Sequence, residues 1–171
     1  MHYLAVSRAR AYLRDCGAYL GLAAATVPLG VVGQITGWGK KPPFAYAVSV
    51  APPILAALLA ARQEARHGAT PGKRHHHLIV TKRAGTPITF GRALTRNCLK
   101  IAIPWQLGHM VAIGAVFGGF DKKDPLTLGA AFITYPLLAA MILGVVLGDG
   151  RTIHDRLSGT RVVGTAITSQ G

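Results

Sequence analysis

The chain has 171 residues, of which 50% are hydrophobic, and it carries a formal net charge of +13. Such a charge can indicate a nucleic-acid partner, but all 19 basic and 6 acidic residues lie outside four uncharged stretches, so we expect a membrane protein with no nucleic-acid partner and no large soluble domain. The stretches cover residues 16–38, 43–61, 101–120 and 126–148. About 20 apolar residues cross a hydrocarbon core roughly 30 Å thick, so we predict one all-α membrane domain with four transmembrane helices over residues 1–171.

The basic residues lie mainly on one side of this domain. If the amino terminus is cytoplasmic, 15 of the 19 basic residues fall in cytoplasmic segments, which include the loop 62–100 and the tail 149–171. The opposite side has only Lys40, Lys41, Lys122 and Lys123. Lys and Arg remain on the side from which a chain is inserted. We therefore predict a multi-pass protein of the inner (cytoplasmic) cell membrane, with both termini cytoplasmic and with anionic lipid headgroups as partners.

Proline and small residues recur within the predicted helices. Every span contains proline, at Pro28, Pro52, Pro53, Pro104 and Pro136. Proline frees a backbone carbonyl, so we expect kinks toward protein or water, although membrane helices also tolerate proline without a functional reason. Small residues at three- and four-residue spacing favour close packing or a homo-oligomer. They are Gly17, Gly21, Ala24, Ala25, Gly114 and Gly118.

The segment that leads into the third span resembles the one that leads into the first. Residues 10–16 and 92–98 are identical at four of seven positions, and Asp15 corresponds to Asn97. Each segment precedes an out-and-back pair of spans. The pattern predicts two parallel two-helix repeats, with chance similarity between Arg- and Ala-containing segments as the alternative.

The loop between the two halves contains two predicted soluble elements. Residues 77–82 and 86–90 are β-prone runs on either side of a turn, which predicts a small cytoplasmic hairpin. Residues 91–100 place basic side chains on one helical face, which predicts a basic interfacial helix. The residues that we expect to contact lipid headgroups are Lys73, Arg74, Arg92, Arg96 and Lys100.

Three segments of the chain resemble the RDD family of bacterial membrane proteins. They are residues 70–74, 90–97 and 150–163, with the sequences TPGKR, FGRALTRN and GRTIHDRLSGTRVV. The resemblance extends over about residues 8–163. It implies a small helical membrane protein, similar in layout to small transporters, and cation exchange has been proposed for some members of the family.

The family is named for one arginine and two aspartates, and each has a counterpart in this chain. The resemblance assigns these positions to Arg8, Asp15 and Asp155, with Arg10 as a rival for the arginine. The chain departs from the mostly apolar family pattern at His75–His77. Three consecutive side chains cannot all face one metal ion from a regular strand, so we expect these histidines to be solvated or near headgroups.

Asp15 has two possible roles at the border of the first span. It could form an ion pair that holds two helices together, and its possible arginine partners are Arg8, Arg14 and Arg96. It could instead bind a cation or a proton. Asp155 has the same two possibilities, and anchoring of the carboxy-terminal segment to the basic loop is favoured because this segment lies outside the predicted spans.

Gln106 and His109 form a polar face in the otherwise apolar third span. His109 lies toward the bilayer midplane, and histidine titrates near neutral pH, so it could relay protons or bind a small cation. The alternative is a hydrogen bond to another helix, through Tyr135 or Gln34. The predicted ion or proton path therefore comprises Asp15, Gln106 and His109.

Two classes of function remain after the motifs are considered. We find no enzyme signature, no catalytic residue, no metal site and no cofactor motif. The first class is an oligomeric transporter or exchanger of a small cation, coupled to protons. The second is a non-catalytic accessory or scaffolding subunit of a larger membrane complex.

The predicted topology can be tested by cysteine labelling. In cells that express His76→Cys or Lys122→Cys, a membrane-impermeant thiol reagent applied from outside should label position 122 and leave position 76 unlabelled. The reason is that the central loop belongs to the cytoplasmic side and Lys122 to the opposite side. The reverse labelling pattern would overturn the topology.

Overall fold

The computed structural model describes residues 2–147 and 149–165. In agreement with the predicted spans, four helical segments are long and apolar enough to cross a membrane. They cover Ala5–Thr36, Pro42–His67, Phe90–Val116 and Pro125–Val146. The predicted end of the fourth span at residue 148 and the end of the predicted tail, residues 166–171, lie outside the described residues.

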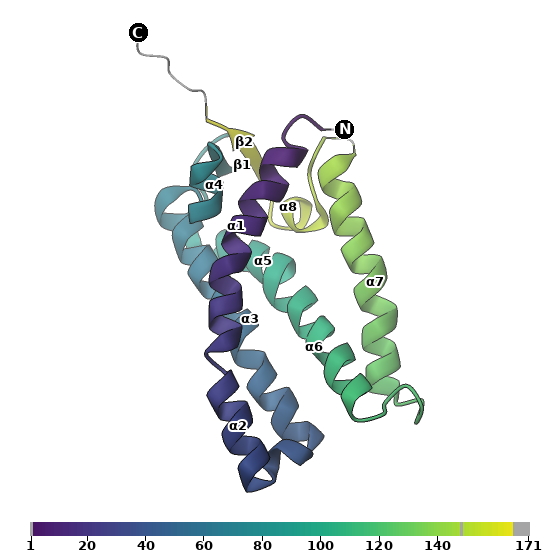
Figure 1. The fold of residues 1–171 in the computed structure, drawn as a ribbon. Helices are drawn as coiled ribbons and strands as arrows, with labels where there is room; N and C mark the ends of the chain where they lie inside the picture. Colours follow the sequence, from purple (N-terminus) through teal and green to yellow (C-terminus); the bar gives the residue numbers. More distant parts are fainter. Residues whose placement is uncertain (1, 148, 166–171) are drawn as a thin grey trace.

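The first two membrane-length segments run in opposite directions and are joined by a short turn (Figure 1). Their elements are α1 (Ala5–Ala24), α2 (Val27–Thr36), the 3-10 helix η1 (Trp38–Lys40) and α3 (Pro42–His67). Pro28, in the first turn of α2, has no amide hydrogen for the carbonyl of Ala24, and its ring would clash with that carbonyl. For this reason α1 ends at Ala24 and the first segment is interrupted there.

The remaining elements form two more membrane-length helices and a cap at one end. They are α4 (Pro71–His75), β1 (Leu78–Lys82), α5 (Phe90–Asn97), the π-helical turn η2 (Cys98–Ala102), α6 (Ile103–Val116), α7 (Pro125–Val146), α8 (Ile153–Leu157) and β2 (Thr160–Gly164). Residues 90–97 are helical, as predicted for 91–100, but α5, η2 and α6 follow one another directly as one membrane-length segment. The interfacial position of the basic part stays a prediction. Pro104 has no amide hydrogen for the carbonyl of Lys100, yet it does not end this helix. The wider π-helical turn before it has a different hydrogen-bonding pattern and leaves room for the proline ring.

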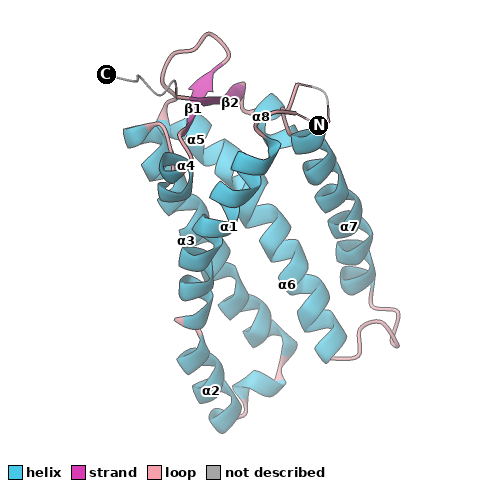
Figure 2. Ribbon diagram, turned by 45° about the horizontal axis from the view of Figure 1, so that its top comes forward, coloured by secondary structure: helices cyan, strands magenta, loops and turns pink. Residues whose placement is uncertain are grey.

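β1 and β2 pair as an antiparallel sheet at the end of the bundle that also contains the amino terminus (Figure 2). Ile79 lies opposite Val163 in this sheet. The predicted hairpin is therefore wrong in its partner, since residues 86–90 contribute only an isolated bridge between Thr81 and Pro87. Pro87 has no amide hydrogen, so it cannot donate a hydrogen bond to a neighbouring strand. The fold is thus mostly helical, as predicted, but its small sheet joins the central loop to the carboxy-terminal segment instead of forming a hairpin within the loop.

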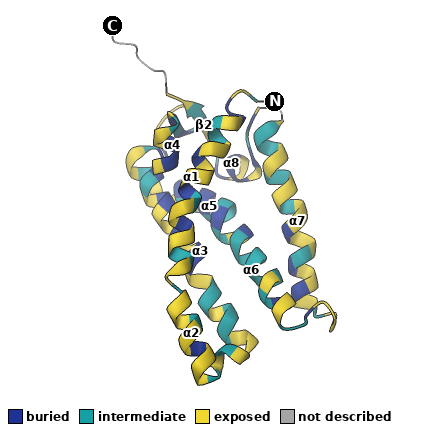
Figure 3. Cartoon of the chain, in the orientation of Figure 1, coloured by how far each residue is buried: buried dark blue, intermediate teal, exposed yellow. Residues whose placement is uncertain are grey.

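Burial is concentrated near the sheet (Figure 3). One apolar cluster there includes Leu4, Leu78 and Val162, and a second joins α1, α3 and the third membrane-length helix around Tyr19 and Ile101. Large apolar side chains elsewhere are exposed along the helices, for example Ile35, Val116 and Phe132. Such apolar helix faces are suited to contact with lipid.

Gly114 and Gly118 do not form a shared contact face. Gly114 packs so closely against Thr127 of α7 that an added Cβ would collide with that side chain. Thr127 is held in place because its amide and hydroxyl donate to Asp124 Oδ2 at 2.8 and 2.6 Å. Gly118 lies in the following turn with φ of +72°. Gly114 therefore allows a close contact within the chain, and Gly118 allows the turn that follows the helix.

We expect Gly114→Ala to lower the free energy of unfolding in detergent by about 1–3 kcal/mol, because the new methyl group overpacks the contact with Thr127. Gly108 is the matched control on the same helix, since its Cβ position has no atom of the described chain within 4 Å apart from its chain neighbours and the adjacent backbone of α6. Gly108→Ala should be neutral or stabilise by up to about 1 kcal/mol. Equal effects of the two substitutions on unfolding would contradict the packing argument.

Candidate functional site

Five buried charged side chains meet at the capped end of the bundle, each from a different element. We call them the ionic cluster: Arg8 of α1, Glu64 of α3, Lys73 of α4, Arg96 of α5 and Asp155 of α8. Their side chains are at most 9% exposed. Buried charges are costly unless they are paired and hydrogen-bonded, so these elements must come together for the chain to fold.

Glu64 joins the second and third membrane-length helices. Lys73 Nζ and Arg96 Nη1 each donate to Glu64 Oε1 at 2.7 Å, and Asn97 Nδ2 donates to Oε2 at 2.8 Å. Glu64 continues a buried face of small residues on α3, which lets the helix approach its neighbours closely. The members of this face are Ala56, Ala57, Ala60 and Ala61.

Asp155 joins the first helix to the third. Arg8 Nη2 donates to its Oδ2 at 2.7 Å, and Arg96 Nε donates to its Oδ1 at 3.0 Å. A capping box with Thr152 also places this carboxylate in the first turn of α8. Burial would raise the pKa of the Asp155 carboxyl, but Arg96 and Arg8 hold it well below its usual range. Arg10, the rival of Arg8 in the sequence, is exposed.

His154 is buried beside the ionic cluster. Its Nε2 lies 2.7 Å from Thr152 Oγ1. Burial and the nearby charge of Arg96 lower the pKa of the His154 imidazole well below its usual range. The ring is therefore neutral at physiological pH, and it adds no positive charge to a cluster of three cations and two carboxylates.

Asp15 lies outside the ionic cluster. Thr70 Oγ1 donates to its Oδ2 at 2.6 Å, and the amide of Gly72 donates to its Oδ1 at 2.7 Å. Asp15 thus connects α1 to the start of α4 through uncharged donors. The prediction that it pairs with an arginine is wrong, because Arg8 and Arg96 are bound to Asp155, while Arg14 is exposed.

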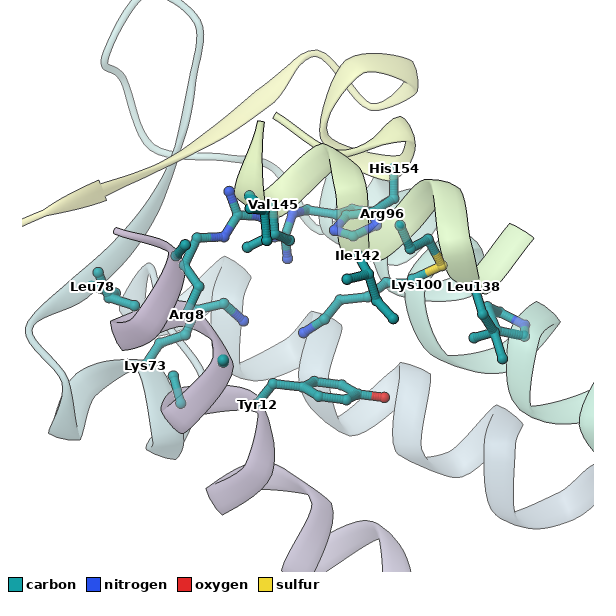
Figure 4. A pocket seen from close by; sticks show the side chains of 16 residues that line it. Arg8, Tyr12, Lys73, Leu78, Arg96, Lys100, Leu138, Ile142, Val145 and His154 are labelled. Carbon is teal, nitrogen blue, oxygen red and sulfur yellow. The ribbon is translucent and has the colours of Figure 1, made fainter. Parts of the chain in front are cut away.

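A cavity of about 380 Å³ lies beside the ionic cluster, between α1 and α7 (Figure 4). Its basic lining consists of Arg8, Lys73, Arg96 and Lys100, and its apolar lining includes Tyr12, Leu138, Met141, Ile142 and Val145. Figure 4 shows Lys100 and Tyr12 reaching into the same space, and Lys100 Nζ lies 4.8 Å from the centroid of the Tyr12 ring. The cavity therefore combines a basic part with an apolar wall.

The five residues predicted to contact headgroups have different environments. The prediction of an exposed headgroup contact is wrong for Lys73 and Arg96. Both are buried in the ionic cluster, because they pair with the carboxylates of Glu64 and Asp155. Arg74 and Arg92 are exposed, and their contact with headgroups stays a prediction. Lys100 is half-buried in the cavity.

Gln106 and His109 both bond to Ser49 of α3. Gln106 Nε2 donates to Ser49 Oγ at 3.1 Å, and His109 Nδ1 lies 3.0 Å from the Ser49 carbonyl oxygen. Trp105 Nε1 donates to His109 Nε2 at 2.9 Å, so the ring hydrogen is on Nδ1 and points to Ser49. Pro53 explains this contact, because it has no amide hydrogen for the Ser49 carbonyl and His109 supplies one instead.

The hydrogen bond between helices that the sequence suggested for His109 is thus present, but its partner is Ser49 rather than Tyr135 or Gln34. A second pocket, of about 270 Å³, lies between α2, α3 and α6. Its polar lining includes Thr26, Gln34, Ser49 and His109. Of the three residues in the predicted ion path, only His109 lines this pocket in the part of the chain that the structure describes. Asp15 is bound to Thr70 and Gly72 instead, so it does not belong to the pocket.

Metal binding has no support from side-chain clustering. Within residues 2–147 and 149–165, no three His, Cys, Asp or Glu side chains are grouped as ligands. His75 and His76 lie edge to face, with ring centroids 5.0 Å apart. Their predicted role near headgroups stays a prediction.

Sequence reasoning missed Glu64 and Ser49. Glu64 falls outside the uncharged stretch 43–61, so it was assigned to the loop, although its spacing from Ala56, Ala57 and Ala60 places it on the same face of α3. Ser49 could have been found through Pro53, which is four residues later and leaves the Ser49 carbonyl without its helical donor.

A comparison with protein families matches the chain over residues 5–159 to the RDD family. This range contains all five members of the ionic cluster and also Asp15. No curated protein and no solved structure matched the chain in two further comparisons.

We expect Asp155→Asn to lower the free energy of unfolding in detergent by about 3–5 kcal/mol, because it leaves three buried cations with one carboxylate. Asp149 is the matched control, since it is exposed and pairs with Arg156 at 2.8 Å. Asp149→Asn should cost less than about 1 kcal/mol. Denaturant unfolding followed by circular dichroism measures both losses, and a small loss for Asp155→Asn would contradict the assigned role of the cluster.

Proposed function

The chain belongs to the RDD family, and we propose that it transports or exchanges a small cation across the cell membrane, coupled to protons and as an oligomer. Its four membrane-length apolar helices make it a multi-pass membrane protein. The uneven distribution of basic residues supports cytoplasmic termini. In that orientation the ionic cluster lies at the cytoplasmic end and the second pocket lies deeper in the membrane.

The observation that carries this proposal is the position of the second pocket beside an interrupted helix and a helix that contains two prolines. The pocket adjoins the break between α1 and α2, and Pro52 lies in its lining. Pro52 and Pro53 remove the amide hydrogens that would bond to the carbonyls of Val48 and Ser49. Transporters bind ions where helices are interrupted, because freed carbonyls can replace water around the ion. The uncharged oxygen atoms of this lining suit a small monovalent cation.

His109 supports coupling to protons. The neutral ring donates to the Ser49 carbonyl and accepts from Trp105. Protonation at Nε2 removes the acceptor for Trp105 and places a positive charge beside the pocket. A protonated His109 and a bound cation therefore repel each other, and this mutual exclusion is what proton-coupled exchange requires.

An oligomer is supported by an uncovered face of α1. Apart from their chain neighbours and the adjacent backbone of α1, no atom of the described chain lies within 4 Å of the Cβ positions of Gly17 and Gly21. Small residues of this kind let helices of neighbouring subunits approach closely. In such an oligomer the two predicted two-helix repeats of each subunit would follow one another around the ring. Asp15 and Asn97, both buried, would take equivalent positions in the two repeats.

The second candidate function is an accessory or scaffolding subunit of a larger membrane complex. The ionic cluster favours it, because these charges hold the chain's own elements together. The neighbouring cavity is also unsuited to cations, since its lining carries more positive than negative charge. In this function the uncovered face of α1 would contact a different protein.

Reconstituted liposomes distinguish the two functions. Parent protein should show proton movement that depends on an added cation and on pH. His109→Gln keeps a donor for Ser49 but cannot titrate, so it should fold normally and lose this pH dependence. His75→Gln, at an exposed position, is the control and should behave like the parent.

The accessory function would be supported by a different result. Folded parent protein would then produce no flux with a panel of monovalent and divalent cations. In addition, a larger membrane protein would co-purify with it at fixed stoichiometry.

A further inference from the structure

We propose that the cavity beside the ionic cluster binds the phosphate group of an anionic phospholipid, with an acyl chain of the same lipid lying along α7. This site is separate from the pocket at His109, so it does not depend on the proposed transport. The sequence already suggested that Lys100 contacts headgroups. The proposed site is more specific, because it lies in a cavity beside the ionic cluster rather than on the surface.

The charges around the cavity leave one cation without a carboxylate. Glu64 binds Lys73 and Arg96, and Asp155 binds Arg8 and Arg96. Lys100 Nζ, by contrast, makes no ion pair or hydrogen bond with any residue in the described ranges 2–147 and 149–165, and it rests over the Tyr12 ring. An ammonium group withdrawn from water needs an anion, and a phosphate oxygen can accept its hydrogen bonds.

The opposite wall of the cavity is apolar and belongs to a membrane-length helix. Met141, Ile142 and Val145 of α7 line it. Ile142 is also 64% exposed, so the wall continues onto the outer surface of α7. A free phosphate ion would gain nothing from this wall, whereas an acyl chain would bury apolar surface along it.

The position and size of the cavity agree with this occupant. Lys100 precedes the apolar part of the third membrane-length helix, and charged side chains at such helix ends lie at headgroup depth. A volume of about 380 Å³ accommodates a headgroup phosphate with the adjoining part of a lipid.

Binding can be measured on the purified full chain in detergent, by native mass spectrometry and by the shift in unfolding temperature on addition of lipid. Dioleoyl phosphatidylglycerol should bind and stabilise the parent, while dioleoyl phosphatidylcholine should do so more weakly. Lys100→Gln should weaken phosphatidylglycerol binding by about tenfold, since it removes a charge-assisted hydrogen bond. Lys100→Arg should largely retain binding.

Lys41→Gln is the matched control, because Lys41 Nζ also rests over an aromatic ring, 5.3 Å from the centroid of Trp38, and lies at the other end of the bundle. This substitution should leave lipid binding unchanged. Without lipid, Lys100→Gln should be at least as stable as the parent, because it removes a cation that has no anion partner.

Three results would overturn the proposal. One is equal binding of phosphatidylglycerol to the parent and to Lys100→Gln. Another is stabilisation by inorganic phosphate or glycerol phosphate equal to that by phosphatidylglycerol, which would identify the occupant as a free phosphate. The third is an equal loss of binding in Lys41→Gln, which would indicate attraction to net charge rather than to this cavity.

Discussion

Arg96 carries a charge that it cannot lose, and it is almost completely buried. Its guanidinium donates to Glu64 through Nη1 and to Asp155 through Nε, so two carboxylates must reach it from different directions. Glu64 brings α3 to α5, and Asp155 brings the carboxy-terminal segment. Asp155 in turn fixes Arg8 and therefore α1. The arrangement of the capped end of the bundle follows from the need to satisfy this one guanidinium group.

The third membrane-length helix contributes residues to the cavity beside the ionic cluster and also to the second pocket. Arg92, Arg96 and Lys100 are four residues apart, yet the first is exposed, the second is in the ionic cluster and the third faces the cavity. The change follows from the neighbours that the helix meets along its length rather than from residue type. Farther along, Gln106 and His109 contact α3 where Pro53 has freed a carbonyl. A single helix thus links the basic end of the molecule to its membrane-embedded pocket.

The membrane-length helices could be predicted because the cost of placing charge in lipid acts on every residue of a span. The interruption at Pro28 was also predictable, since it follows from covalent geometry. The partners of buried polar groups were not. β1 pairs with a strand some 80 residues away instead of residues 86–90, and Asp15 accepts from a threonine and an amide instead of an arginine. These partners depend on which of several chemically similar groups the folded chain brings close, and the sequence alone does not show which group that is.

The pairing of Arg8 with Asp155 spans 147 positions of the chain, almost its whole length. A ribosome that adds about 5–20 residues per second exposes Arg8 on the order of 10 s before Asp155 exists. During that interval the first three membrane-length helices can insert, while Arg8 has no carboxylate and the cap is incomplete. Any chain that stops short of α8 therefore presents unpaired cations at the membrane surface. The cap of the bundle can therefore be completed only after the last segment has been made, whatever the order in which the membrane-length helices insert.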